Sequence, residues 1–81
     1  MPEIFRFRGY RFFFFSNEGS PREPIHVHVR KGNKLAKFWV RPNIVLAESF
    51  GMSPKELNEI FKIVDSHKRQ IVKAWNEHFG S

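Results

Sequence analysis

Cysteine is absent from this chain of 81 residues, and so is any long run of apolar residues. Without cysteine the protein has no disulfide framework and no thiolate ligand for a metal. A membrane-spanning helix needs about 20 consecutive apolar residues, and the start of the chain, Met1 to Arg6, lacks the apolar stretch of a signal peptide. We therefore expect a cytoplasmic protein with no membrane partner.

Acidic residues are scarce in the first half of the chain. Residues 1–41 carry nine Lys or Arg and three Glu, a net charge of +6, whereas residues 42–81 carry five charged residues of each sign. The whole formal charge therefore belongs to the N-terminal half. This asymmetry predicts an anionic partner, although it says nothing about the fold.

The chain is too short for more than one modest core, because a domain of this size buries only about 60% of the surface of its unfolded chain. We predict a single domain over residues 1–81. Aromatic residues are nevertheless frequent, with ten Phe, two Trp and one Tyr. That is more than one small core needs.

The segment 24–30, Pro-Ile-His-Val-His-Val-Arg, alternates strictly between apolar and polar side chains and so predicts a half-buried strand. Its apolar face holds Ile25, Val27 and Val29, and its polar face holds His26, His28 and Arg30. The Cα atoms of the two histidines are then about 6.5–7 Å apart. That spacing suits a shared ligand, a metal or a proton-transfer pair.

Turn residues divide residues 1–49 into the strands of an antiparallel sheet. Arg8-Gly9 and Gly32-Asn33 are typical two-residue turns. The first turn places Ile4 opposite Phe13, and the second places His28 opposite Lys37 and His26 opposite Trp39. Strands are expected at 4–7, 10–16, 25–30 and 35–40, with 43–49 as a further candidate. We therefore predict a meander of four or five strands.

A helix is predicted within residues 53–79. Ser53 and Glu56 form a capping box around Pro54 at the first helical position, and apolar residues then recur at helical spacing up to Gly80. We expect one long helix, about residues 54–78, packed on the apolar face of the sheet. The predicted fold class is therefore α+β.

The other face of the sheet combines rings with cations. We call it the basic-aromatic face and define it by Arg6, Arg11, Phe13, Phe15, His26, His28, Arg30, Leu35, Lys37 and Trp39. It is too aromatic for a surface that only meets water and too basic for an ordinary core. Three hypotheses follow: it binds single-stranded RNA, it binds a protein partner, or a second copy of the chain or the C-terminal segment covers it.

The two histidines allow three interpretations. The first is cross-strand packing of both rings, with His26 beside Trp39. As an acid–base pair, His26 and His28 would cleave RNA without a metal, with Arg30 or Lys37 holding the phosphate charge. Zinc needs three or four ligands and only two are local, so we assign no metal and no cofactor.

Six ordered motifs resemble those of a small prokaryotic family known as domain of unknown function 4160. They are Gly9–Phe12, Ser16–Glu18, Pro24–Val29, Ala36–Val40, Gly51–Leu57 and Trp75–Phe79. The family usually has two prolines before the first histidine, and Ile25 replaces the second one here. The resemblance implies that the gene lies beside that of another small protein, in a pair that resembles a toxin–antitoxin module.

The sequence thus predicts a small component of a toxin–antitoxin-like module that binds RNA or a cognate protein through the basic-aromatic face. A metal-independent ribonuclease that uses His26 and His28 is the first alternative. A metal-binding or oligomeric structural module is the second.

Overall fold

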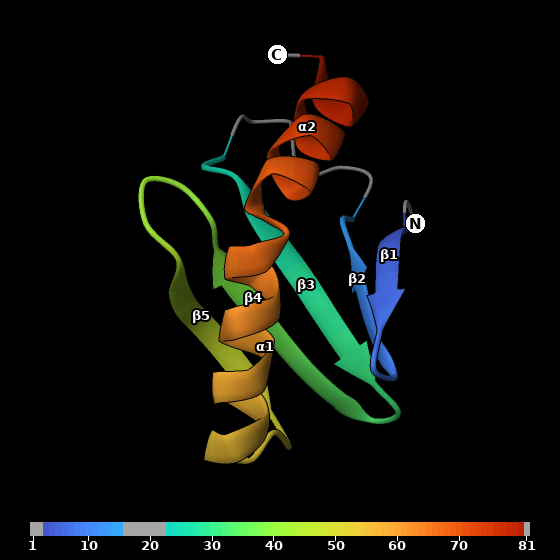
Figure 1. The fold of residues 1–81 in the computed structure, drawn as a ribbon, viewed down its shortest axis with the longest axis vertical. Helices are drawn as coiled ribbons and strands as arrows, with labels where there is room; N and C mark the ends of the chain where they lie inside the picture. Colours follow the sequence, from blue (N-terminus) through green and yellow to red (C-terminus); the bar gives the residue numbers. More distant parts are fainter. Residues whose placement is uncertain (1–2, 16–22, 81) are drawn as a thin grey trace.

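The computed structural model describes residues 3–15 and 23–80, which form a five-stranded antiparallel sheet and two helices (Figure 1). The strands are β1 (Glu3–Phe7), β2 (Tyr10–Phe13), β3 (His26–Lys31), β4 (Lys34–Trp39) and β5 (Val45–Phe50). The helices are α1 (Pro54–Ser66) and α2 (Lys68–Phe79). Strands that follow one another in sequence are neighbours in the sheet, so the predicted α+β meander is confirmed. Neither α1 nor α2 is long and apolar enough to cross a membrane.

The turn between β1 and β2 lies at Arg8-Gly9, as predicted, and both residues have positive φ, 53° and 84°. Phe7 faces Tyr10 and Arg6 faces Arg11, but a register shift then places Glu3 opposite Phe13. The predicted pairing of Ile4 with Phe13 is therefore wrong. The irregularity lets Ile4 pack against the core and turns Glu3 toward the face that carries Arg6 and Arg11.

The hairpin of β3 and β4 has the predicted register, with His26 opposite Trp39 and His28 opposite Lys37. Both strands direct apolar side chains to the same face, where Val27 and Phe38 are buried, so a slip by one residue would expose them. The predicted second strand is shorter than expected, because β2 ends at Phe13. Its predicted end at Ser16 lies outside the described residues.

The capping box of α1 is present: the Ser53 hydroxyl accepts a hydrogen bond from the Glu56 backbone N–H, and the Glu56 carboxylate accepts one from the Ser53 N–H. The predicted single helix is interrupted at His67, so that prediction is corrected to two helices. Nδ1 of His67 lies 2.8 Å from the backbone oxygen of Ile63. This side-chain bond competes for a helical acceptor, and His67 has the non-helical angles φ −108° and ψ 17°.

The core lies between the helices and one face of the sheet (Figure 1). Its fully buried side chains include Tyr10, Phe12, Phe14, Val27, Val29, Phe38, Val40, Ile60, Val64 and Ile71. Both helices cover this face, so the opposite face of the sheet has no helix over it within the described chain.

Candidate functional site

The uncovered face of the sheet contains three rows of residues that face one another across the strands. The first row is Arg6, Arg11, Arg30, Leu35 and Phe50. The second row is Glu3, Phe13, His28, Lys37 and Glu48. The third row is His26, Trp39 and Val45. The strand pairings thus bring the predicted site residues of β1 to β4 together, and Phe15 lies two residues after the end of β2.

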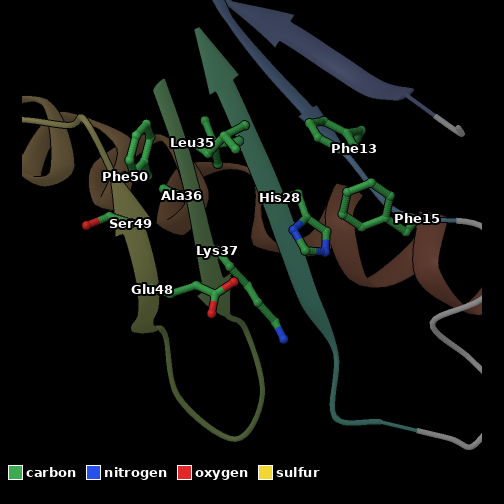
Figure 2. Close-up of a pocket in the computed structure, with 10 residues that line it drawn as sticks. Phe13, Phe15, His28, Leu35, Ala36, Lys37, Glu48, Ser49 and Phe50 are labelled. Atoms are coloured by element: carbon green, nitrogen blue, oxygen red, sulfur yellow. The ribbon is translucent and has the colours of Figure 1, made fainter. Parts of the chain in front are cut away.

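A hollow of about 330 Å³ lies on this face (Figure 2). Phe13, Phe15 and His28 form one wall, and Leu35 and Phe50 stand across from them. Two charged side chains also line the hollow, Lys37 and Glu48, and they have opposite signs. The lining is therefore mainly apolar and has no net formal charge.

His28 is the centre of an aromatic cluster in this hollow. Its ring centroid lies 4.4 Å from that of Phe15 and 5.7 Å from that of Phe13. The rings of Phe13 and Phe15 meet edge to face at 5.5 Å. Phe15 keeps 40% of its surface exposed, whereas Phe13 keeps 6%, so Phe15 is the phenylalanine of this cluster that a ligand would contact.

His26 differs from His28 because its side chain is completely buried. Its ring lies 5.2 Å from the ring of Trp39 and 5.0 Å from that of Trp75 in α2. Nδ1 of His26 lies 2.9 Å from the backbone oxygen of Pro24, and because a carbonyl only accepts, this nitrogen carries the hydrogen. A general acid or base must reach its substrate, so the burial counts against proton transfer by His26.

Two acidic residues that the sequence did not assign to this face reduce its positive charge. The Glu3 carboxylate lies 2.9 Å from Nε of Arg6 and 3.1 Å from Nε of Arg11. The hydrogen bond from Arg6, with a further one from Arg11, holds the pKa of Glu3 below its ordinary value. Glu48, at the other end of the same row, faces Lys37. The shift in β1 had no clear signal in the sequence, whereas β5, Val45–Phe50, largely coincides with the candidate strand at 43–49.

Other cations of the basic-aromatic face also have partners within the protein. Nζ of Lys37 lies 4.5 Å from the centroid of the Trp39 ring, within the range of a cation–π interaction. Nε of Arg30 donates to the backbone oxygen of Gly32 at 3.3 Å. Arg30 is exposed, so the rest of its guanidinium group faces the surface.

A second hollow, of about 300 Å³, lies between β1 and the junction of the helices. Beside it the Tyr10 hydroxyl donates to Glu59 at 3.1 Å, and Arg8 binds the other carboxylate oxygen at 3.3 Å. Burial, and then Glu59, raise the pKa of Tyr10 to about 12. These bonds join the first hairpin to α1, so we interpret the group as structural.

Within residues 3–15 and 23–80, no three His, Asp or Glu side chains lie close enough together to hold a metal ion.

Comparison with known proteins identifies one family. No curated protein and no solved structure matches the chain. A family model described as Domain of unknown function (DUF4160) matches residues 9–76, which include every residue that lines the first hollow. The chain therefore belongs to the DUF4160 family.

Proposed function

We propose that this chain is the binding component of a two-protein, toxin–antitoxin-like module, and that the partner protein docks on the basic-aromatic face. The observation that carries the proposal is the mainly apolar, formally neutral hollow on that face. Leu35 and Phe50 keep 41% and 70% of their surface exposed beside it. Exposed aromatic and aliphatic residues around a concave site are typical of the anchors of protein interfaces.

The charges favour a protein over RNA as the occupant. A platform for single-stranded RNA combines exposed rings with cations that are free to bind phosphates. Here Glu3 binds both Arg6 and Arg11, and Lys37 lies over Trp39. Phe13, one of the predicted stacking rings, is almost completely buried. Stacked bases would therefore find few uncompensated charges close to the hollow.

The apolar hollow and the exposed basic groups of this face indicate the chemistry of the partner. An apolar side chain of the partner would occupy the hollow between Phe15 and Phe50. Carboxylates would face the exposed guanidinium group of Arg30, because the chain as a whole carries a net charge of +6 and complementary charge speeds and orients association. We therefore expect an acidic partner with an aromatic or aliphatic anchor.

The test is co-purification of this chain with the product of the adjacent gene. Phe15→Ser removes the exposed ring of one wall of the hollow and should lower the affinity at least tenfold. Phe61→Ser is the matched control, because Phe61 lies on α1 and has the same 40% exposure as Phe15. Circular dichroism of each variant confirms that it is folded.

RNA binding is the competing outcome of the same experiment. A labelled single-stranded RNA should bind neither the wild type nor Phe15→Ser with appreciable affinity at physiological salt. RNA binding that Phe15→Ser abolishes, together with no complex between the two proteins, would replace the protein partner by RNA on this face.

A further inference from the structure

Strand β5 forms an edge of the sheet that is open to pairing. All six of its residues are exposed, including Val45 at 52%, Leu46 at 40% and Phe50 at 70%. Among the described residues, β4 is the only strand that pairs with it. Edge strands are commonly protected by charged side chains, above all lysine, by proline, by a β-bulge or by very short length. Strand β5 has neither lysine nor proline, and Glu48 is its one charged side chain.

An irregularity in β5 decides which side chains share a face. Lys37 of β4 faces Glu48, and the next residue, Phe38, faces Leu46, so Ala47 is an extra residue in β5. Val45, Glu48 and Phe50 consequently lie on the uncovered face of the sheet. Leu46 and Ser49 lie on the face that the helices cover.

We propose that a second copy of this chain pairs antiparallel with β5 along its whole length. Complete overlap places Val45 opposite Phe50 of the second copy, and Leu46 opposite Ser49 of the second copy. Residues that face each other across two strands must lie on the same side of the sheet. In a regular strand, residues 45 and 50 would lie on opposite sides of the sheet and could not face each other. The extra residue Ala47 places both on the uncovered face, so the two strands can overlap completely.

This pairing buries apolar surface in two symmetric contacts. Each Val45 meets a Phe50 on the uncovered face, and the pair of strands continues the two sheets into one. The two Glu48 side chains come close to the centre of the interface, where like charges repel. Lys37, which faces Glu48 within each copy, offsets part of that repulsion.

The expected dimer is weak and depends on concentration. An interface built on six residues of one strand falls at the small end of protein interfaces. Phe50 also lines the hollow, so the two hollows of such a dimer lie on either side of its centre. The proposal concerns the chain alone and does not depend on a partner protein.

Sedimentation equilibrium of the purified chain, from about 1 µM to about 1 mM, tests this pairing. The wild type should dimerise within that range. Leu46→Lys and Val45→Lys should each raise the dissociation constant at least tenfold, whereas Glu48→Gln should lower it. Phe15→Ser is the control and should leave it unchanged, because Phe15 follows β2 at the other side of the hollow.

Cysteine cross-linking tests the register of the two β5 strands. Because the chain has no cysteine of its own, every disulfide must join introduced residues. An equimolar mixture of Leu46→Cys and Ser49→Cys should form the mixed disulfide under mild oxidation. Each variant alone should cross-link much less, because residue 46 does not face residue 46 of the second copy.

Two results would overturn the proposal. One is a wild type that stays monomeric over the whole concentration range. The other is a dimer that Phe15→Ser dissociates and Leu46→Lys does not, which would place the contact on the basic-aromatic face. Circular dichroism distinguishes a dissociated variant from an unfolded one, and Val45→Lys replaces Leu46→Lys if the latter does not fold.

Discussion

The ring of His26 packs against that of Trp75, with the two centroids 5.0 Å apart. This contact joins the first residue of β3 to helix α2, at one end of the strands. Only His28, the second histidine of the strand, lies beside the hollow. The two histidines that the sequence pairs on one face therefore have different surroundings, one inside the core and one at the candidate site.

The ribonuclease hypothesis can be tested through these histidines. An acid–base pair would give a bell-shaped pH–rate profile between about pH 5 and 8, lost when both residues are replaced by Gln, because each proton transfer is worth roughly 10²–10⁴-fold. Because His26 is buried, we expect no such cleavage. The measurement is RNA hydrolysis by the wild type and the double variant with metal ions chelated. Histidine-dependent cleavage in the wild type would restore the enzyme hypothesis.

Salt should weaken the binding of an acidic partner, since screening reduces attraction between exposed charges. Arg30→Ala should flatten this salt dependence. Arg11→Ala should change it less, because Glu3 already binds the Arg11 guanidinium group. Titrations with the partner at several salt concentrations compare the two variants. Equal effects of both substitutions would show that Glu3 does not compensate Arg11 in the complex.

The cap of α1 should contribute measurably to stability. Ser53→Ala removes the side-chain acceptor of the Glu56 N–H and should lower the free energy of unfolding by about 1 kcal/mol. Denaturation by urea gives this value. Ser66→Ala is a suitable control. The Ser66 hydroxyl donates a hydrogen bond to the Lys62 carbonyl, at the end of α1 opposite the cap.

Low pH should weaken the same cap of α1. The Ser53 backbone N–H, and then Lys34, lower the pKa of Glu56 from 4.5 to about 2. A carboxyl group whose pKa is lower in the folded state contributes stability above its unfolded pKa and loses it as the pH falls. We expect Glu56→Gln to reduce the loss of stability between pH 4.5 and about 2. Urea denaturation of both proteins across that range provides the measurement.

Tyr10 offers a simple optical measurement, because it is the one tyrosine of the chain. Its phenol should titrate near pH 12, as followed by ultraviolet absorbance. A raised pKa contributes stability below the ordinary value of 10.0, and this contribution is lost as the pH rises toward 12. Glu59→Gln should lower the midpoint only in part, since burial is the larger cause. A midpoint near 10 in the folded wild type would contradict this.

The part of the fold that the sequence predicted best is the hairpin of β3 and β4. Both strands alternate apolar and polar residues, which places Val27 and Phe38 on the same face, and the short turn between the strands fixes the register that pairs them. The start of α1 was equally predictable, because a capping box is a local signal.

The features that were missed depend on single contacts between distant residues or on irregularities. The apolar spacing continues from Val64 to Ile71, so periodicity does not reveal the non-helical residue His67 between them. The shift in β1 depends on Glu3 reaching Arg11, and the burial of His26 depends on Trp75. Alternation assigned both histidines to one face but carries no information on how far α2 covers the end of the sheet.

The order of the strands also affects how the chain folds. Every strand pairs with the strand next to it in sequence, so most of the sheet is built from contacts of short sequence separation, which favours rapid folding. The bond between Tyr10 and Glu59 is an exception, since it closes a loop of 49 residues. Docking of α1 against the hairpin of β1 and β2 should therefore follow formation of the hairpin of β3 and β4. Substitutions at Glu59 should consequently raise the unfolding rate more than they lower the folding rate.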